Sequence, residues 1–183
     1  MPKIKPVKIE QLSQNTQAVY DVLNHDSDLA CILIGTNFLD QILASLLENT
    51  FITSQVVHNL LNPVSGAIGA FSVRSDLSYC LGLIDKPQYQ DLIKIATIRN
   101  QFAHSYLSLS FGSPEIQNLC NDLTGWELYI MEDQKDNLVP DEDLTEQQTR
   151  IAARNKFTLT VTFLGSSLSI KSLSAGVKKK GNR

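Results

Sequence analysis

The sequence predicts an all-α protein, a single-domain bundle of about six to seven helices. Apolar residues recur at helical spacing in nearly every segment. Turn residues and prolines separate these segments, and the one stretch that alternates like a strand has no evident partner strand. The 183 residues, 43% of them hydrophobic, are enough for one soluble domain with a buried core.

The first half of the chain predicts a short lead over residues 1–7 and then helices over 8–24, 28–49, 53–61 and 72–83. The polar run from Asn24 to Asp28 supplies N-cap residues for the second helix. That helix is apolar on nearly all sides, so we expect it at the centre of the bundle. Pro63 and the glycines Gly66 and Gly69 mark the turn before the fourth helix.

The second half predicts helices over residues 86–104, 114–123 and 145–172, an irregular apolar piece over 126–130, and loops over 107–113 and 132–143. Asp85 is suited to cap the first of these helices, Pro114 to lie in the first turn of the second, and Thr145 to cap the third. The helical domain therefore covers residues 8–173, and we expect a disordered basic tail over 174–183.

Residues 157–163 are ambiguous. Phenylalanine, leucine and valine alternate there with threonines, a pattern typical of a strand. The stretch nevertheless follows residues 146–156, a strong helix-forming run, without any break. We therefore predict one long helix through this region.

Composition restricts the function. A net charge of −3 and a pI near 5.6 argue against a dedicated DNA-binding domain, although a small phosphate site is still compatible with them. Cys31, Cys80 and Cys120 lie far apart in apolar patterns without metal-ligand spacing, so we expect buried free thiols in a reducing compartment, with no metal and no cofactor. No secretory signal is evident, and we expect a cytoplasmic protein.

After Asp28 at its start, Asp40 is the one charged residue of the apolar helix before Glu48. A membrane span would not carry a carboxylate at its centre, so we interpret the helix as a buried core helix and expect no membrane insertion. A buried carboxylate requires a partner. The candidates are Arg74 and Arg99, and we expect such a pair to brace the bundle.

Arg99, Asn100 and His104 close the helix over residues 86–104. Asn100 and His104 are four residues apart and share one face. An arginine that can hold a phosphate beside a histidine that titrates near neutral pH is a plausible pair for cleaving phosphodiesters. The alternative is structural, because the same residue types at a helix end also cap and brace helices.

Three blocks of sequence resemble the mannitol operon repressor (MltR, also written MtlR) family: GAIGAFSVR at residues 66–74, DLSYCLGLI at 76–84 and IRNQFAH at 98–104. The resemblance covers roughly residues 18–170 and departs from the pattern at Ser75. The arginine-asparagine and alanine-histidine pairs of the third block also resemble the signature of the wider HEPN-like all-helical superfamily.

The first resemblance implies a regulator of sugar-alcohol uptake that acts through a protein partner, with Asp40, Arg74, Asp76, Arg99, Asn100 and His104 as a polar cluster for structure or binding. The second implies a metal-independent ribonuclease acting on RNA as a homodimer. In that case His104 would transfer the proton, Arg99 would stabilise the phosphate, and Asn100 would orient the imidazole. The expectation of a homodimer comes from this resemblance alone. A small-ligand sensor is a third reading.

Overall fold

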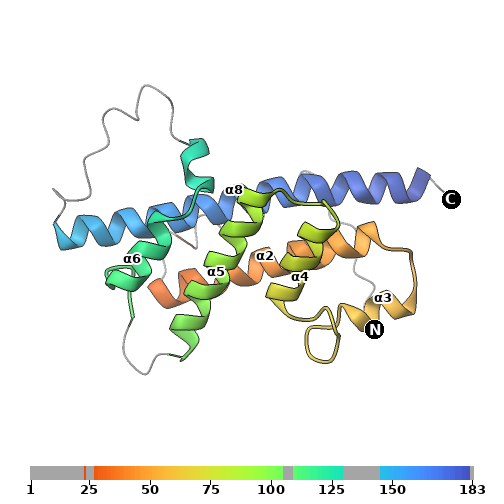
Figure 1. Ribbon diagram of the computed structural model, residues 1–183, viewed down its shortest axis with the longest axis horizontal. Helices are drawn as coiled ribbons and strands as arrows, with labels where there is room; N and C mark the ends of the chain where they lie inside the picture. Colours follow the sequence, from red (N-terminus) through yellow and green to blue (C-terminus); the bar gives the residue numbers. More distant parts are fainter. Residues whose placement is uncertain (1–22, 24–26, 105–108, 130–144, 182–183) are drawn as a thin grey trace.

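The computed structural model describes residue 23 and residues 27–104, 109–129 and 145–181, which form six α-helices and one 3-10 helix without a strand. This confirms the all-α fold class. The predicted helix over residues 8–24, apart from residue 23, and the predicted loop over 132–143 lie outside the described residues. The elements are α2 (Asp28–Thr50), α3 (Gln55–Leu60), α4 (Phe71–Cys80), α5 (Lys86–His104), α6 (Pro114–Asn121), η1 (Gly125–Tyr129) and α8 (Glu146–Gly181) (Figure 1).

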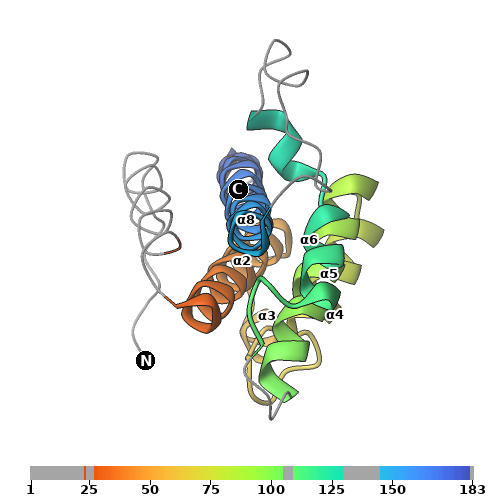
Figure 2. The same ribbon diagram turned by 90° about the vertical axis from the view of Figure 1, so that its left-hand side faces the viewer.

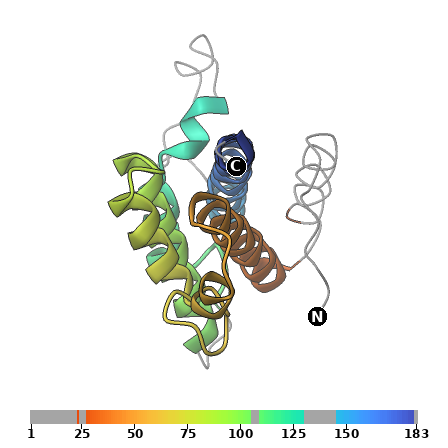
Figure 3. The same ribbon diagram turned by 90° about the vertical axis from the view of Figure 1, so that its right-hand side faces the viewer.

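The helices are arranged in two layers. α2 and α8 pack together along the long axis of the molecule, and α4, α5 and α6 lie together on one side of this pair (Figure 2). The opposite end view shows α3 following the C-terminal end of α2, below α8 (Figure 3). α2 and α8 run parallel, since Asp28 near the start of α2 bonds Arg154 and Asn49 near its end bonds Ser172.

Local sequence signals set most of the helix ends. The Ser27 hydroxyl accepts the Ala30 N–H at the start of α2, and the Asp85 carboxylate accepts the Gln88 N–H at the start of α5. Thr145 and Gln148 form a reciprocal capping box before α8. After α4 the chain turns at Gly82, whose φ of 66° places it in the left-handed region where glycine carries no penalty.

The stretch over residues 157–163 is helical and lies in the middle of α8. Its large apolar side chains enter the core between the two layers, and the Phe157 ring lies 5.5 Å from that of Phe111. The prediction of one long helix is confirmed. α8 presents its apolar residues to α2 on one side and to α6 and η1 on another. The alternating pattern reflects two buried faces of a helix.

The C-terminal segment differs from the prediction. We expected the last helix to end near Ser172 and residues 174–183 to be disordered, but α8 continues to Gly181. Contacts with the end of α2 hold its last turns: the Asn49 amide donates to the Ser172 carbonyl and hydroxyl, and Lys179 Nζ donates to the Glu48 carbonyl. Lysines in a last helical turn are also favourable to the helix dipole.

The cysteine prediction was partly wrong. Cys31 and Cys120 are buried thiols as expected, whereas Cys80 is exposed on α4. Burial raises the pKa of the Cys120 thiol to about 12, and the neighbouring Cys31 adds to this, against the opposing effect of Lys156. Cys120 is therefore protonated and unreactive at neutral pH.

α2 is the helix whose length and composition alone would allow it to cross a membrane, among the residues described. In the fold it packs against α8, α4 and α5, and residues such as Leu39, Leu43 and Leu47 are fully buried. Its single mid-helix carboxylate, Asp40, is paired with Arg74. These contacts are those of a core helix in a helical bundle.

Candidate functional site

The polar cluster predicted from the sequence is divided between three places in the fold. Its members form an ion pair between layers, a contact on the outer edge of α4 and α5, and a group at the C-terminal end of α5. These are Asp40 with Arg74, Asp76 with Tyr89, and Arg99 with Asn100 and His104.

Arg74 is a structural clamp. Its side chain is 3% exposed, and Nη1 donates to Asp40 Oδ1 at 2.6 Å. The other guanidinium nitrogens donate to the carbonyls of Leu61 and Ile68, at 2.8 and 3.0 Å. Arg74 and Arg99 were the two partners expected for Asp40, and in the structure Asp40 pairs with Arg74. The pair joins a buried arginine to a carboxylate that is 23% exposed, and it braces α2, α4 and the loop between α3 and α4 as predicted.

Aromatic side chains gather on the outer edge of α4 and α5. Tyr79 and Tyr89 stack with their ring centroids 4.7 Å apart, and the Tyr89 hydroxyl donates to Asp76 Oδ1 at 2.9 Å. This hydrogen bond raises the pKa of Tyr89, because it favours the protonated hydroxyl beside a carboxylate. Val73 on α4 and Leu81 at its C-cap are exposed as well. We call Val73, Asp76, Tyr79, Leu81 and Tyr89 the tyrosine edge.

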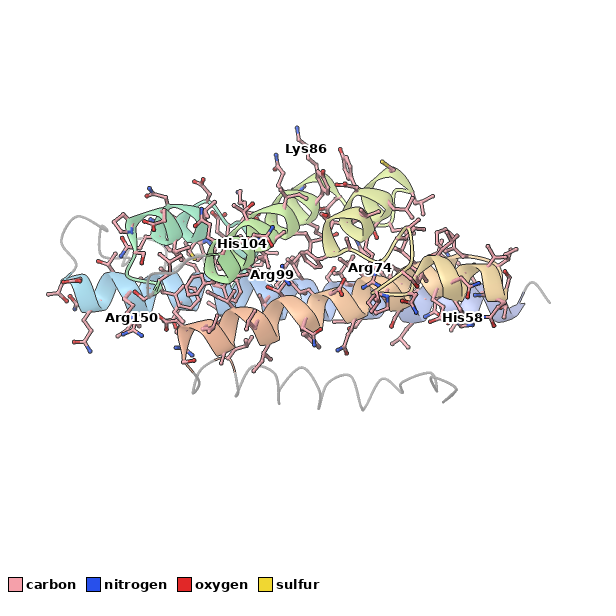
Figure 4. All side chains as sticks on the ribbon, turned by 90° about the horizontal axis from the view of Figure 1, so that it is seen from below. His58, Arg74, Lys86, Arg99, His104 and Arg150 are labelled. Carbon is pink, nitrogen blue, oxygen red and sulfur yellow. The ribbon has the colours of Figure 1, made fainter. Side chains whose placement is uncertain are left out.

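Arg99, Asn100 and His104 are exposed at the C-terminal end of α5, in the last turn and a half of the helix (Figure 4). Arg99 Nη1 donates to Asn100 Oδ1 at 2.9 Å, so Asn100 positions the guanidinium. The resemblance to HEPN-like proteins implied instead that Asn100 orients the imidazole of His104. Both Arg99 and His104 face solvent, which is the arrangement required of residues that bind a phosphate group from solution.

The sequence did not predict that Asp28 forms ion pairs, because its position suggested only the start of a helix. It is 6% exposed and accepts hydrogen bonds from Arg150, Arg154 and the Phe111 N–H, at 3.0 to 3.1 Å. Burial by itself would raise the pKa of Asp28, but the hydrogen bonds from Arg150 and Phe111 and the charges of both arginines outweigh it and lower the pKa. The available signal was the spacing of Arg150 and Arg154, four residues apart on one face of α8.

Asp91 on α5 is a second buried carboxylate that the sequence analysis missed. It is 1% exposed and accepts the N–H groups of Thr124 and Gly125 and the Thr124 hydroxyl. It thereby holds the start of η1 against α5. Within the described ranges, no group of three or more histidine, cysteine, aspartate or glutamate side chains could hold a metal ion.

Comparison with known proteins identifies the family. The family model of MtlR, the mannitol repressor, matches residues 15–174. The chain belongs to this family. The MtlR assignment agrees with the resemblance that the three sequence blocks indicated. A search of curated proteins gave no significant match.

Two solved structures share the MtlR fold. The MtlR–HPr complex from Escherichia coli matches with a TM-score of 0.66 and 21% identity, over 84% of this chain and 98% of that chain. A possible transcriptional regulator, YggD from Shigella flexneri, matches with a TM-score of 0.65 and 17% identity, over 91% of this chain and 99% of that one. At these identities the likeness establishes the helical fold.

Proposed function

We propose that this MtlR-family protein is a cytoplasmic regulator of sugar-alcohol uptake, that of mannitol in particular, and that it acts by binding a protein partner. Membership of the mannitol repressor family supports the regulatory role. The structural neighbour from Escherichia coli was solved with HPr, which makes HPr the first partner to test. The observation that supports a protein contact over DNA binding is that many arginine and lysine side chains are bound within the protein itself.

Many lysine and arginine side chains are bound to groups of the protein itself. Arg74, Arg150 and Arg154 contact aspartates and carbonyls, Lys94 donates to the Asp122 carbonyl, and Lys179 donates to the Glu48 carbonyl. Lys156 and Lys171 donate to amide oxygens of Asn121 and Gln88. A DNA-binding face requires several cations directed at phosphates. The described residues offer no such basic stripe, so a protein contact is the better supported mechanism.

The tyrosine edge has the composition of a transient protein interface. Such interfaces combine aromatic and aliphatic side chains with charged residues at the rim. Tyr79 is 40% and Leu81 45% exposed, the Asp76 carboxylate accepts the Tyr89 hydroxyl, and Lys86 at the start of α5 is exposed. The stack on Tyr89 fixes the Tyr79 ring, so little side-chain entropy is lost when a partner covers it.

We expect purified HPr to bind the full chain in isothermal titration calorimetry, and Tyr79→Ala to weaken this binding at least about tenfold through loss of an aromatic anchor. Ile151→Ala on α8 is a matched control, since Ile151 is 50% exposed but lies on another helix, and it should leave the affinity unchanged. Mannitol-operon operator DNA should show no salt-dependent binding to the chain. Tight operator binding without HPr would contradict the proposal.

A metal-independent ribonuclease is the second candidate function. One observation favours it: Arg99 and His104 are exposed together, while the ion pairs that brace the bundle use Arg74, Arg150 and Arg154 instead. Under this hypothesis His104 takes the proton of a ribose 2′-hydroxyl, and Arg99, positioned by Asn100, stabilises the charge that develops on the phosphate.

If this second function is correct, the wild-type chain cleaves labelled single-stranded RNA in EDTA, and Arg99→Ala and His104→Ala each reduce the rate at least about a hundredfold. Because both residues are exposed, circular dichroism should show that the variants remain folded. Arg150→Ala, which removes an exposed arginine at another place, should cleave like the wild type. Equal cleavage by all four proteins would indicate a contaminating nuclease and reject the catalytic role.

A further inference from the structure

A pocket of about 470 Å³ opens between the loop that precedes α6 and the first turns of α8. The two helices pack together at this end of the molecule (Figure 1). The volume of the pocket lies within the range of about 300 to 1,000 Å³ that is typical of sites for small molecules. The residues that line it are all polar or glycine: Ser110, Gly112, Ser113, Glu146, Gln147 and Arg150. The pocket shares no residue with the tyrosine edge or with the group at the end of α5.

Hydrogen bonds within the loop preorganise one wall of the pocket. The Ser110 hydroxyl oxygen accepts the Gly112 N–H at 3.0 Å, and the Ser113 hydroxyl oxygen accepts the Ser110 N–H at 3.2 Å. The Gln117 amide donates to the Gly112 carbonyl at 3.0 Å and holds the loop against α6. Because each serine oxygen acts as an acceptor in these bonds, its O–H can serve as a donor to a ligand in the pocket.

The wall formed by α8 carries both charged residues of the pocket. The capping box at the start of α8 fixes the backbone of Glu146 and Gln147. Arg150 donates through Nε to Asp28 Oδ2 at 3.1 Å, and its Nη2 lies 3.1 Å from the same oxygen. This ion pair holds the guanidinium in place and does not use Nη1, which can therefore donate to a ligand.

The charges around the pocket select among possible ligands. Arg150 and Arg154 share the negative charge of Asp28. Glu146 adds a second carboxylate, so two cations are balanced by two carboxylates, and an anionic ligand such as a phosphate meets no excess of positive charge. An apolar ligand would lack the apolar walls on which its binding depends. The pocket therefore fits a small uncharged molecule with many hydroxyl groups, because each hydroxyl can both donate and accept.

We propose that this pocket binds a polyol, a hexitol such as mannitol, and that the chain thereby senses the sugar alcohol whose uptake it regulates. The class of ligand follows from the residues of the pocket, while the choice of mannitol rests on the proposed function. Hydroxyls of the ligand donate to the Glu146 carboxylate and accept from the Ser113 hydroxyl and the Arg150 guanidinium. A hexitol held in this way connects the loop wall to the α8 wall.

Both walls of the pocket are attached to the same buried carboxylate. Asp28 binds Arg150 from the α8 wall and accepts the Phe111 N–H at 3.0 Å. Phe111 lies between Ser110 and Gly112 in the loop wall. A ligand that connects the walls stabilises this junction, since it binds only the folded arrangement. Bound mannitol should therefore slow amide hydrogen exchange at Phe111 and in the first turn of α2.

The experiment is a titration of the isotope-labelled full chain with D-mannitol, followed by NMR. We expect saturable shifts of the backbone amides of Gly112, Ser113 and Arg150, with a dissociation constant of about 0.1 to 10 mM for a small polar ligand. A six-carbon diol with hydroxyls only at its two ends is the matched probe, and it should give no saturable shift. Saturation distinguishes binding from the general exclusion of polyols from protein surfaces.

Two substitutions in the α8 wall test the site. Glu146→Ala and Arg150→Ala should each raise the dissociation constant for mannitol at least about tenfold, because each removes a charged hydrogen-bonding partner. Glu115→Ala is the matched control: Glu115, like Glu146, is an exposed glutamate in the first turn of a helix, but it does not line the pocket. This variant should bind mannitol like the wild type. Circular dichroism should show that all three variants are folded, since the replaced side chains are exposed.

Three results would overturn the proposal: no saturable shift with mannitol, shifts confined to residues away from the pocket, or equal weakening by Glu115→Ala. Tighter binding of a hexitol that carries a terminal phosphate would overturn the assignment to an uncharged polyol. Calorimetry with HPr keeps this inference separate from the proposed function. Binding of HPr without binding of mannitol would reject the pocket and leave the protein contact in place. Binding of mannitol without binding of HPr would support the pocket and count against the protein contact.

Discussion

Replacing Asp28 with alanine is expected to lower the free energy of unfolding by about 3 to 5 kcal/mol, the range found when one member of a buried ion pair is removed. Asp28 joins three parts of the chain: the start of α2, the Phe111 backbone and the N-terminal half of α8. Without its carboxylate, the Arg154 guanidinium, only 17% exposed, loses its ion pair with Asp28, and the Phe111 N–H loses the Asp28 acceptor. Urea denaturation of the full chain measures the effect.

Acid unfolding gives an independent test of Asp28. Because the folded state lowers the pKa of this carboxyl below its ordinary value of 3.8, its contribution is complete above that value and is lost as the pH falls through the lower, folded-state pKa. We expect the stability of the wild type to fall more steeply below about pH 4 than that of Asp28→Asn, which has no carboxyl to protonate at that position.

The two arginines provide an internal control. Arg150 is 52% exposed, so Arg150→Ala should cost less than about 1 kcal/mol, whereas Arg154→Ala, which also removes two hydrogen bonds to the Leu23 carbonyl, should cost more. If both variants lost the same free energy of unfolding, the contribution of each ion pair would not follow its burial. That result would contradict the role given to Asp28.

Arg74→Ala is the second substitution with a large expected effect, again about 3 to 5 kcal/mol. It leaves Asp40 without its cation and two carbonyls, those of Leu61 and Ile68, without their donors. Amide hydrogen exchange should increase over residues 61–70, because the guanidinium fixes this loop, while exchange in the middle of α8 should follow only the global loss of stability.

Arg74→Lys serves as the control for charge. Lysine keeps the cation, but it lacks the planar fork that reaches Asp40 and both carbonyls at once. We expect it to recover less than half of the stability lost in Arg74→Ala. Full recovery would mean that charge alone holds the loop. If the two carbonyls matter as described, Asp40→Asn should also cost less than Arg74→Ala.

Much of the fold could be predicted from the sequence because its signals are local. The caps at Ser27, Asp85 and Thr145, and the left-handed glycine at Gly82, act within a few residues and set helix ends directly. The pairing of Asp40 with Arg74 was one of two possibilities, because a buried carboxylate needs a cation and few arginines lie in apolar helices.

The remaining features depend on contacts that no local pattern reveals. The last turns of α8 stay helical because Asn49 and the Glu48 carbonyl of α2 hold them, and Cys80 is exposed because α4 lies at an edge of the bundle. The sequence could not predict that the polar cluster divides between three places. Helical spacing shows which residues share a face of one helix, but it does not show which face of a neighbouring helix they meet. The roles of Arg99, Asn100 and His104 await the RNA-cleavage measurement.

The parallel pairing of α2 with α8 determines when the protein can fold during synthesis. Asp28 and Arg154 are separated by 126 positions, and residues 9–73 contain no lysine or arginine that could pair with Asp28 earlier. At about 5 to 20 residues per second, α2 leaves the ribosome roughly 6 to 25 s before its partner helix does. During that interval its apolar face is accessible to chaperones and to other nascent chains, so yield in the cell should depend on chaperone supply more strongly than the stability of the finished bundle suggests.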